Sequence, residues 1–171
     1  MSKRLVIEPE AVVMVLSEDQ ELDAPRPIVA SLGATIGPRA RILIKLPKPS
    51  WKEPVVRAWL VLERADYAQA GPSDVRVRAE KIVEAWSAKG GAGTTWASPP
   101  RSEAIDGAEI NVTPRGGAPI RIDITPYVAA AMKKGAVAWG LRVEGSGKGF
   151  GVPIATGFGK GLGPRVELYV Q

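Results

Sequence analysis

The chain has 171 residues, a formal net charge of +5 and a composition that is 45% hydrophobic, which suits one domain with its own core. It contains no cysteine and no histidine, and this excludes disulfides, thiolate nucleophiles, Ser-His-Asp triads and most zinc sites. Nineteen glycines and fifteen prolines are spread along the chain, as in proteins built from many short strands joined by turns.

The beginning of the chain predicts neither a signal peptide nor a membrane span. Its apolar stretches are interrupted by Glu8, Pro9 and Glu10, and no segment approaches the roughly 20 apolar residues of a membrane helix. Basic residues occur in pairs, without the run and interleaved aromatics of a nucleic-acid site. We therefore expect one domain over residues 1–171, with 1–10 a candidate for an extended arm, made in the cytoplasm, with no membrane or nucleic-acid partner.

The first predicted strand is apolar on both faces, from Val12 to Leu16. A strand of this kind is central in its sheet or is covered by a partner. An acidic loop follows, in which Asp19, Glu21 and Asp23 resemble the first half of a calcium loop. The glycine of the sharp turn and the distal bidentate glutamate are missing, so a turn closed by prolines is the alternative to this weak calcium candidate.

Two later strands carry apolar side chains on the face that should meet solvent. Alternation over residues 41–46 turns Leu43 outward, and alternation over residues 54–63 does the same to Trp59 and Val61. If the two strands are neighbours in one sheet, these side chains form an apolar patch, which is typical of a contact surface between proteins. The alternative is that a loop or the N-terminal segment covers them.

Three tryptophans in predicted loops are candidates for stacking on sugar rings, namely Trp51, Trp86 and Trp96. Trp86 precedes a glycine-rich stretch, and Trp96 follows it. The alternative for Trp86 and Trp96 is that they plug the ends of a β-sandwich, because indoles bury a large apolar surface.

The most regular stretch of the sequence lies between residues 120 and 144. Isoleucines alternate with charged residues over 120–124, which predicts a half-buried strand. Thr125 and Pro126 then suit the start of a helix, and two lysines followed by a glycine suit its end, so we predict a helix from Pro126 to Lys134. Period-two alternation resumes after the glycine and predicts a second strand.

Six short motifs, spread over residues 11–170, are shared with one known family. They are RILIKL at 41–46, AWLVL at 58–62, Trp86 with TTW at 94–96 and Pro99, IDIT at 122–125, WGLRV at 139–143 and PRVEL at 164–168. The chain thereby resembles the DNRLRE-type domain, a jelly-roll-like module of bacterial and archaeal surface proteins and some carbohydrate-binding modules. The resemblance implies an all-β, jelly-roll-like antiparallel β-sandwich with one short helix.

Three classes of function can be weighed. An enzyme without His or Cys would depend on carboxylates, Lys, Tyr or Ser, and no carboxylate pair stands out as that of a glycosidase, so we expect no enzymatic activity and no cofactor. A structural subunit of a phage or phage-like particle, such as a decoration, collar or tail-associated protein, suits a jelly roll and the apolar patch. Its partners would be other subunits, including copies of itself, and it would be virion-associated. The alternative is a carbohydrate-binding or adhesion module of a cell-surface protein, with a glycan on the three tryptophans.

Overall fold

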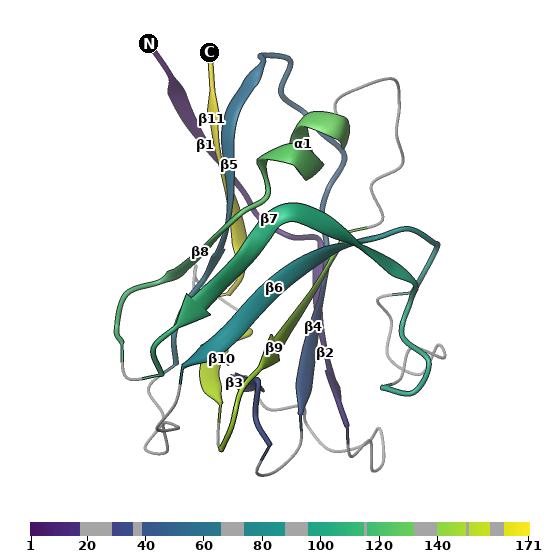
Figure 1. Cartoon of the computed structure of the whole chain (residues 1–171). Helices are drawn as coiled ribbons and strands as arrows, with labels where there is room; N and C mark the ends of the chain where they lie inside the picture. The colour runs from purple at the N-terminus through teal and green to yellow at the C-terminus, as the bar shows by residue number, and fades with distance from the viewer. Residues whose placement is uncertain are drawn as a thin grey trace.

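The computed structural model describes residues 1–17, 29–35, 39–65, 74–87, 96–114, 116–131, 140–149, 151–157 and 163–171. Within these ranges the chain forms eleven β-strands and one short α-helix (Figure 1). All the strand pairs are antiparallel. The predicted all-β, sandwich-like fold with one short helix is therefore confirmed.

The strands form two main sheets and one separate pair. The four-stranded sheet has the order β1 (Lys3–Ile7), β11 (Arg165–Val170), β5 (Val55–Leu62) and β8 (Ile120–Asp123). The five-stranded sheet has the order β2 (Ala11–Leu16), β4 (Ala40–Lys45), β9 (Leu141–Ser146), β6 (Val75–Ile82) and β7 (Ser102–Val112). The pair consists of β10 (Val152–Ala155) and β3 (Val29–Leu32).

The core lies between the inner faces of the two main sheets. Alternation turns Ile42 and Ile44 inward from β4, and it turns Leu60 inward from β5 and Ile122 from β8, so that all four belong to one buried cluster. Each of these side chains is at most 1% exposed. Burial of so much apolar surface is the main stabilising contribution to the fold.

The helix α1 covers Thr125–Ala131 and lies at the end of the sandwich where the two termini are found (Figure 1). The predicted helix began one residue later, and residues 132–134 of its predicted end lie outside the described residues. Thr125 was expected to cap the helix. Its hydroxyl instead donates to Asp123 at 2.6 Å and accepts from the backbone N–H of Ala58 at 3.0 Å, which ties the helix start to β5.

The N-terminal segment is part of a sheet rather than an arm. Residues Lys3–Ile7 form β1, which pairs with β11 in the register Lys3 to Val170 and Ile7 to Val166. The two ends of the chain therefore lie side by side (Figure 1). No helix in the described part of the chain is long and apolar enough to cross a membrane.

Candidate functional site

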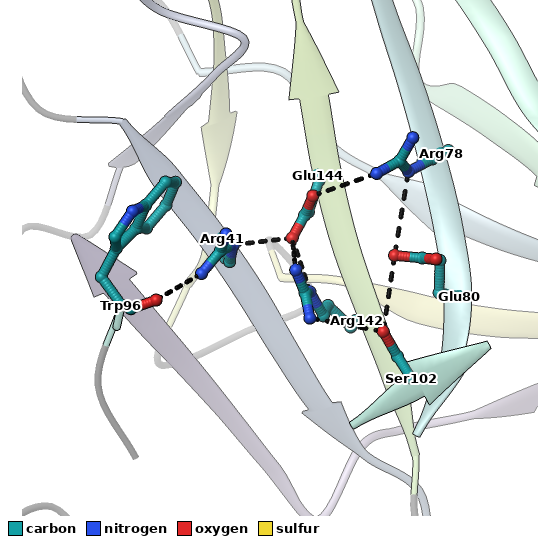
Figure 2. Close-up of polar contacts among 7 residues, drawn as sticks. All are labelled: Arg41, Arg78, Glu80, Trp96, Ser102, Arg142 and Glu144. Carbon is teal, nitrogen blue, oxygen red and sulfur yellow. Dashed lines mark hydrogen bonds and ion pairs between the residues drawn. The ribbon is translucent and has the colours of Figure 1, made fainter. Parts of the chain in front are cut away.

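The outer face of the five-stranded sheet carries a ladder of charged side chains (Figure 2). Alternation turns Arg41 outward from β4, and it turns Arg142 and Glu144 outward from β9. On the other side of β9, the register places Arg78 of β6 opposite Glu144 and Glu80 opposite Arg142. Opposite charges therefore face each other across neighbouring strands, an arrangement that stabilises cross-strand pairs.

Glu144 is the centre of this ladder, because three guanidinium groups surround its carboxylate. Arg41 Nε lies 2.6 Å from Oε1, Arg142 Nε donates to the same oxygen at 2.5 Å, and Arg78 Nη2 lies 3.4 Å from Oε2. The side chains of Arg41, Arg142 and Glu144 are only 14–16% exposed, whereas that of Arg78 is 54% exposed. Glu144 thus pairs with two shielded arginines and with one arginine that is available to solvent.

A second carboxylate extends the ladder towards β7. Glu80 lies 3.8 Å from Arg78 Nε, and it accepts a hydrogen bond from the Ser102 hydroxyl at 3.5 Å. Arg142 Nη1 donates to the same hydroxyl at 3.4 Å. The network therefore connects β4, β9, β6 and β7, which are four of the five strands of the sheet.

Trp96 forms one boundary of the ladder. The Arg41 guanidinium lies 3.7 Å from the centroid of the Trp96 ring and donates from Nη1 to the Trp96 carbonyl at 2.7 Å, while Arg39 lies 5.3 Å from the same centroid. These are cation–π contacts. Burial lowers the pKa of Arg41, and the charge of Glu144 opposes that change. Arg41 is consequently held in one place by a carboxylate on one side and an indole on the other.

A depression of about 130 Å³ lies beside Glu144 on this face. Its walls are formed by Arg76, Arg78, Glu109, Glu144, Gly145 and Ser146. The Arg76 and Glu109 side chains are 60% and 45% exposed and form an ion pair at 3.0 Å. The depression therefore presents charged donors, charged acceptors and one hydroxyl, and among the described residues no apolar side chain lines it.

The predicted apolar patch of Leu43, Trp59 and Val61 does not exist. Leu43 is in the five-stranded sheet, Trp59 and Val61 are in the four-stranded sheet, and both Leu43 and Val61 are fully buried. Leu43 does point to the outer face, but it forms a small second core there with Val15 and Ile82. The prediction was wrong because it placed two strands from different sheets in one sheet.

The tryptophans that were proposed as sugar platforms lie in two places. Trp86 and Trp96 both pack against the second core of Val15, Leu43 and Ile82, on the outer face of the five-stranded sheet. This second core also explains why β2 is apolar on both faces although it is an edge strand. Trp51 packs against the main core instead, next to α1. Trp59 is half-buried, with Arg57 5.4 Å from its ring centroid.

The four-stranded sheet has a comparable cluster on its outer face. Glu167 accepts from Arg4 at 2.7 Å, from Arg121 at 2.8 Å and from Arg165 at 3.4 Å, and its side chain is 0% exposed. Burial alone would raise the pKa of Glu167, but the hydrogen bonds from Arg4 and Arg121 outweigh it and lower the pKa to about 2. Arg4 and Arg121, and not the carboxylate, face solvent here, and Glu167 holds β1, β8 and β11 together.

Metal binding gains no support in the part of the chain that the structure describes. No group of three or more His, Cys, Asp or Glu residues there could hold an ion. The weak calcium candidate of Asp19, Glu21 and Asp23 lies outside the described residues.

The charged ladder was not predicted as a site from the sequence. Its outward positions follow from alternation at Arg41, Arg78 and Arg142, but the convergence of these arginines on Glu144 depends on the strand order β4-β9-β6, which alternation does not reveal. Complementary charges at outward positions of separate strands were the available signal. No protein-family model matches the chain, and a search of curated proteins finds no significant match.

Proposed function

We propose that the chain is a non-enzymatic carbohydrate-binding module whose ligand lies on the outer face of the five-stranded sheet, in the depression beside Glu144. The observation that carries this proposal is the mixture of groups in the depression. Arg76 and Arg78 supply N–H donors, Glu109 and Glu144 supply acceptors, and Ser146 supplies a hydroxyl that does both. Adjacent sugar hydroxyls also donate and accept, so they can pair with both kinds of group.

The charge balance of the depression favours an uncharged ligand rich in hydroxyls. Arg76 is paired with Glu109 at 3.0 Å, and Arg78 is shared between Glu144 at 3.4 Å and Glu80 at 3.8 Å. A phosphate or sulfate would meet these carboxylates as well as the arginines, and like charges at close range are costly. A neutral polyol avoids that repulsion and still uses the half-exposed guanidinium groups.

Trp96 has a supporting part in this proposal rather than the stacking part first expected of it. Arg41 already lies 3.7 Å from its ring centroid, so at least one face of the indole is occupied. By fixing Arg41 it also fixes the carboxylate of Glu144, which lines the depression. The site is therefore preorganised, which reduces the entropic cost of binding.

The proposal can be tested with a panel of soluble neutral polysaccharides, measured by isothermal titration with the wild-type chain. Arg78→Ala removes an exposed donor of the depression, and it should weaken binding about tenfold because hydrogen bonds to charged groups contribute about 1.5 kcal/mol or more. Arg57→Ala is the matched control, since Arg57 is 51% exposed against 54% for Arg78 and also forms an ion pair, but on the other sheet. Absence of binding to every polysaccharide, or equal weakening by both variants, would contradict the proposal.

The assembly-subunit proposal keeps one specific observation in its favour. Val6 of β1 and Val56 of β5 are 44% and 48% exposed on the four-stranded sheet, and β1 is an edge strand of that sheet. Edge strands with exposed apolar side chains are sites for pairing with another chain. A subunit of a phage-like particle that self-assembles in this way should be an oligomer by light scattering and should dissociate on Val6→Asp. A wild-type monomer would remove self-assembly through this edge.

A further inference from the structure

The strand β1 forms an edge of the four-stranded sheet that is open to another chain. It pairs with β11 on one side only, and none of the other backbone hydrogen bonds between described residues involves it. The N–H and C=O groups that face away from β11 therefore have no backbone partner in the described part of the chain. A row of such groups is a template for pairing with a further strand.

The centre of β1 lacks the features by which edge strands usually avoid such pairing. Val6 is 44% exposed on the outer face of the sheet, while Leu5 and Ile7 are partly buried against the main core. Protected edges carry lysines, prolines, bulges or inward-pointing charges. From Leu5 to Ile7 the strand has none of these, and its register with β11 is continuous.

The two ends of this segment carry opposite charges on the same face. Arg4 and Val6 lie on the outer face, and Glu8 directly follows the strand, so that continued alternation places it on that face as well. Arg4 is still 53% exposed although it donates to Glu167. Glu8 is exposed and forms no ion pair with any described residue. The outer face of the edge thus carries a cation, an apolar side chain and an anion, in that order.

This order is complementary to a second copy of itself that runs in the opposite direction. In an antiparallel pair with Val6 opposite Val6 of the second copy, Arg4 of each strand lies opposite Glu8 of the other, and Leu5 lies opposite Ile7. Opposite charges and apolar pairs are the favourable combinations across strands. Directly opposite residues point to the same face, so the neighbouring registers are centred on Leu5 or Ile7. Both would place the exposed Val6 opposite a charge.

We propose that the chain forms a two-fold symmetric dimer in which two β1 strands pair with Val6 at the centre, so that two four-stranded sheets become one. The occupant of the open edge is therefore a second copy of this chain. The proposal makes the assembly candidate described above specific, because an isologous contact of this kind closes at two copies. The dimer itself does not depend on carbohydrate binding.

The symmetry of this dimer has a consequence for the depression beside Glu144. The two-fold axis of an antiparallel strand pair runs perpendicular to the sheet, because opposite side chains stay on the same face. Both five-stranded sheets then lie on the same side of the joined sheet, and the two depressions open in the same direction. This consequence rests on the proposed carbohydrate binding: one long polysaccharide would contact both sites and gain affinity without any new contact.

The first test is light scattering over a dilution series of the wild-type chain and of Glu8→Arg. We expect a wild-type dimer, and Glu8→Arg should raise its dissociation constant about tenfold because two attractive pairs with Arg4 become repulsive. Glu10→Arg is the matched control, since Glu10 is also exposed but lies beyond Pro9 and outside the pairing. A wild-type chain that stays monomeric at its highest soluble concentration would overturn the proposal. An equal effect of both variants would overturn it as well.

The second test determines the register by cross-linking. The chain contains no cysteine, so Val6→Cys introduces a single thiol that the proposed register places opposite its own copy. Opposite Cα atoms in an antiparallel pair are about 4.5–5.5 Å apart, which a disulfide can span. Val56→Cys is the control, because Val56 is 48% exposed on the same sheet but lies on β5, which is not an edge strand. Mild oxidation should cross-link Val6→Cys much faster, and equal rates would overturn the register.

Titration with carbohydrate keeps the dimer and the proposed function apart. Glu8→Arg should weaken binding of a long polysaccharide and leave binding of a short oligosaccharide unchanged, because only the long ligand reaches both depressions. A wild-type dimer that passes the first two tests and binds no carbohydrate would support the dimer and contradict the proposed function. A monomer that binds carbohydrate would do the reverse.

Discussion

The outer faces of the two main sheets differ in which charged side chains they shield from water. Each has one glutamate among three arginines, Glu167 on the four-stranded sheet and Glu144 on the five-stranded sheet. On the four-stranded sheet the anion is buried completely, and two of its cations, Arg4 and Arg121, are 53% and 44% exposed. On the five-stranded sheet Arg41 is as shielded as the glutamate, each being 16% exposed, and an open depression lies beside the pair.

This difference shows which charged group on each face depends on its ion-pair partners for stability. A charge that is shielded from water depends on its partner, whereas an exposed charge can be solvated when its partner is removed. On the five-stranded sheet the shielded Arg41 and Arg142 therefore depend on Glu144. On the four-stranded sheet the buried Glu167 depends on its arginines. A cluster of the first kind, with an accessible edge, can also meet a ligand, while a cluster of the second kind is closed and serves the fold.

The largest expected effect comes from removing each glutamate. Glu144→Ala leaves Arg41 and Arg142 shielded, adjacent and unpaired, so it should lower the free energy of unfolding by about 3 kcal/mol. Glu167→Ala should cost about half as much, because Arg4 and Arg121 can be solvated and Arg165 keeps its 2.6 Å contact with Glu63. Urea denaturation of the two variants measures both values. An equal or larger loss of unfolding free energy for Glu167→Ala would contradict the proposed difference between the two faces.

Acid titration should show an intermediate effect that belongs to Glu167. Its pKa falls from 4.5 to about 2 in the folded state, so its contribution to stability is fully present above pH 4.5 and is lost as the pH falls towards 2. Urea denaturation at several pH values should show wild-type stability decreasing over this interval, and Glu167→Gln should show a flatter profile. Parallel profiles for the two proteins would mean that the three arginines do not stabilise the carboxylate.

The smallest expected effects on stability come from the exposed arginines of the two faces. Arg57→Ala and Arg78→Ala each remove an ion pair whose arginine is about half exposed, and such pairs contribute about 0.5 kcal/mol. Both variants should therefore unfold within about 1 kcal/mol of wild type in urea. A larger loss of stability for Arg78→Ala alone would mean that the ladder depends on Arg78. The binding experiment would then use the more conservative variant Arg78→Lys.

The sequence predicted the inner face of the sandwich better than anything outside it. Regular alternation identified the strands around Ile42, Leu60 and Ile122, and each of these residues is in the core. Regular alternation does not hold in β7. The buried residues of β7 are Ile105, Ala108 and Val112, at spacings of three and four, because the strand is irregular at Gly107, where φ is +74°, and its register with β6 shifts nearby.

The outer faces could not be predicted, because their properties depend on contacts between distant strands. Leu43 has the same sequence pattern whether solvent or Trp86 and Trp96 cover it. Arg41 and Glu144 are 103 positions apart, and only the pairing of β4 with β9 brings them together. The small pocket near α1 that Trp51 and Tyr127 line likewise requires four segments to meet, and neither residue carries a local signal that it would lie there.

The antiparallel pairing of β1 with β11 also determines how the molecule should respond to a pulling force. Both ends of the chain lie at the same end of this pair, with Lys3 opposite Val170. Tension applied at the two termini would therefore load the hydrogen bonds between the strands one after another, as in opening a zipper, instead of shearing all of them at once. The first barrier to extension should be low, and Arg4 with its bond to Glu167 stands near the beginning of that path.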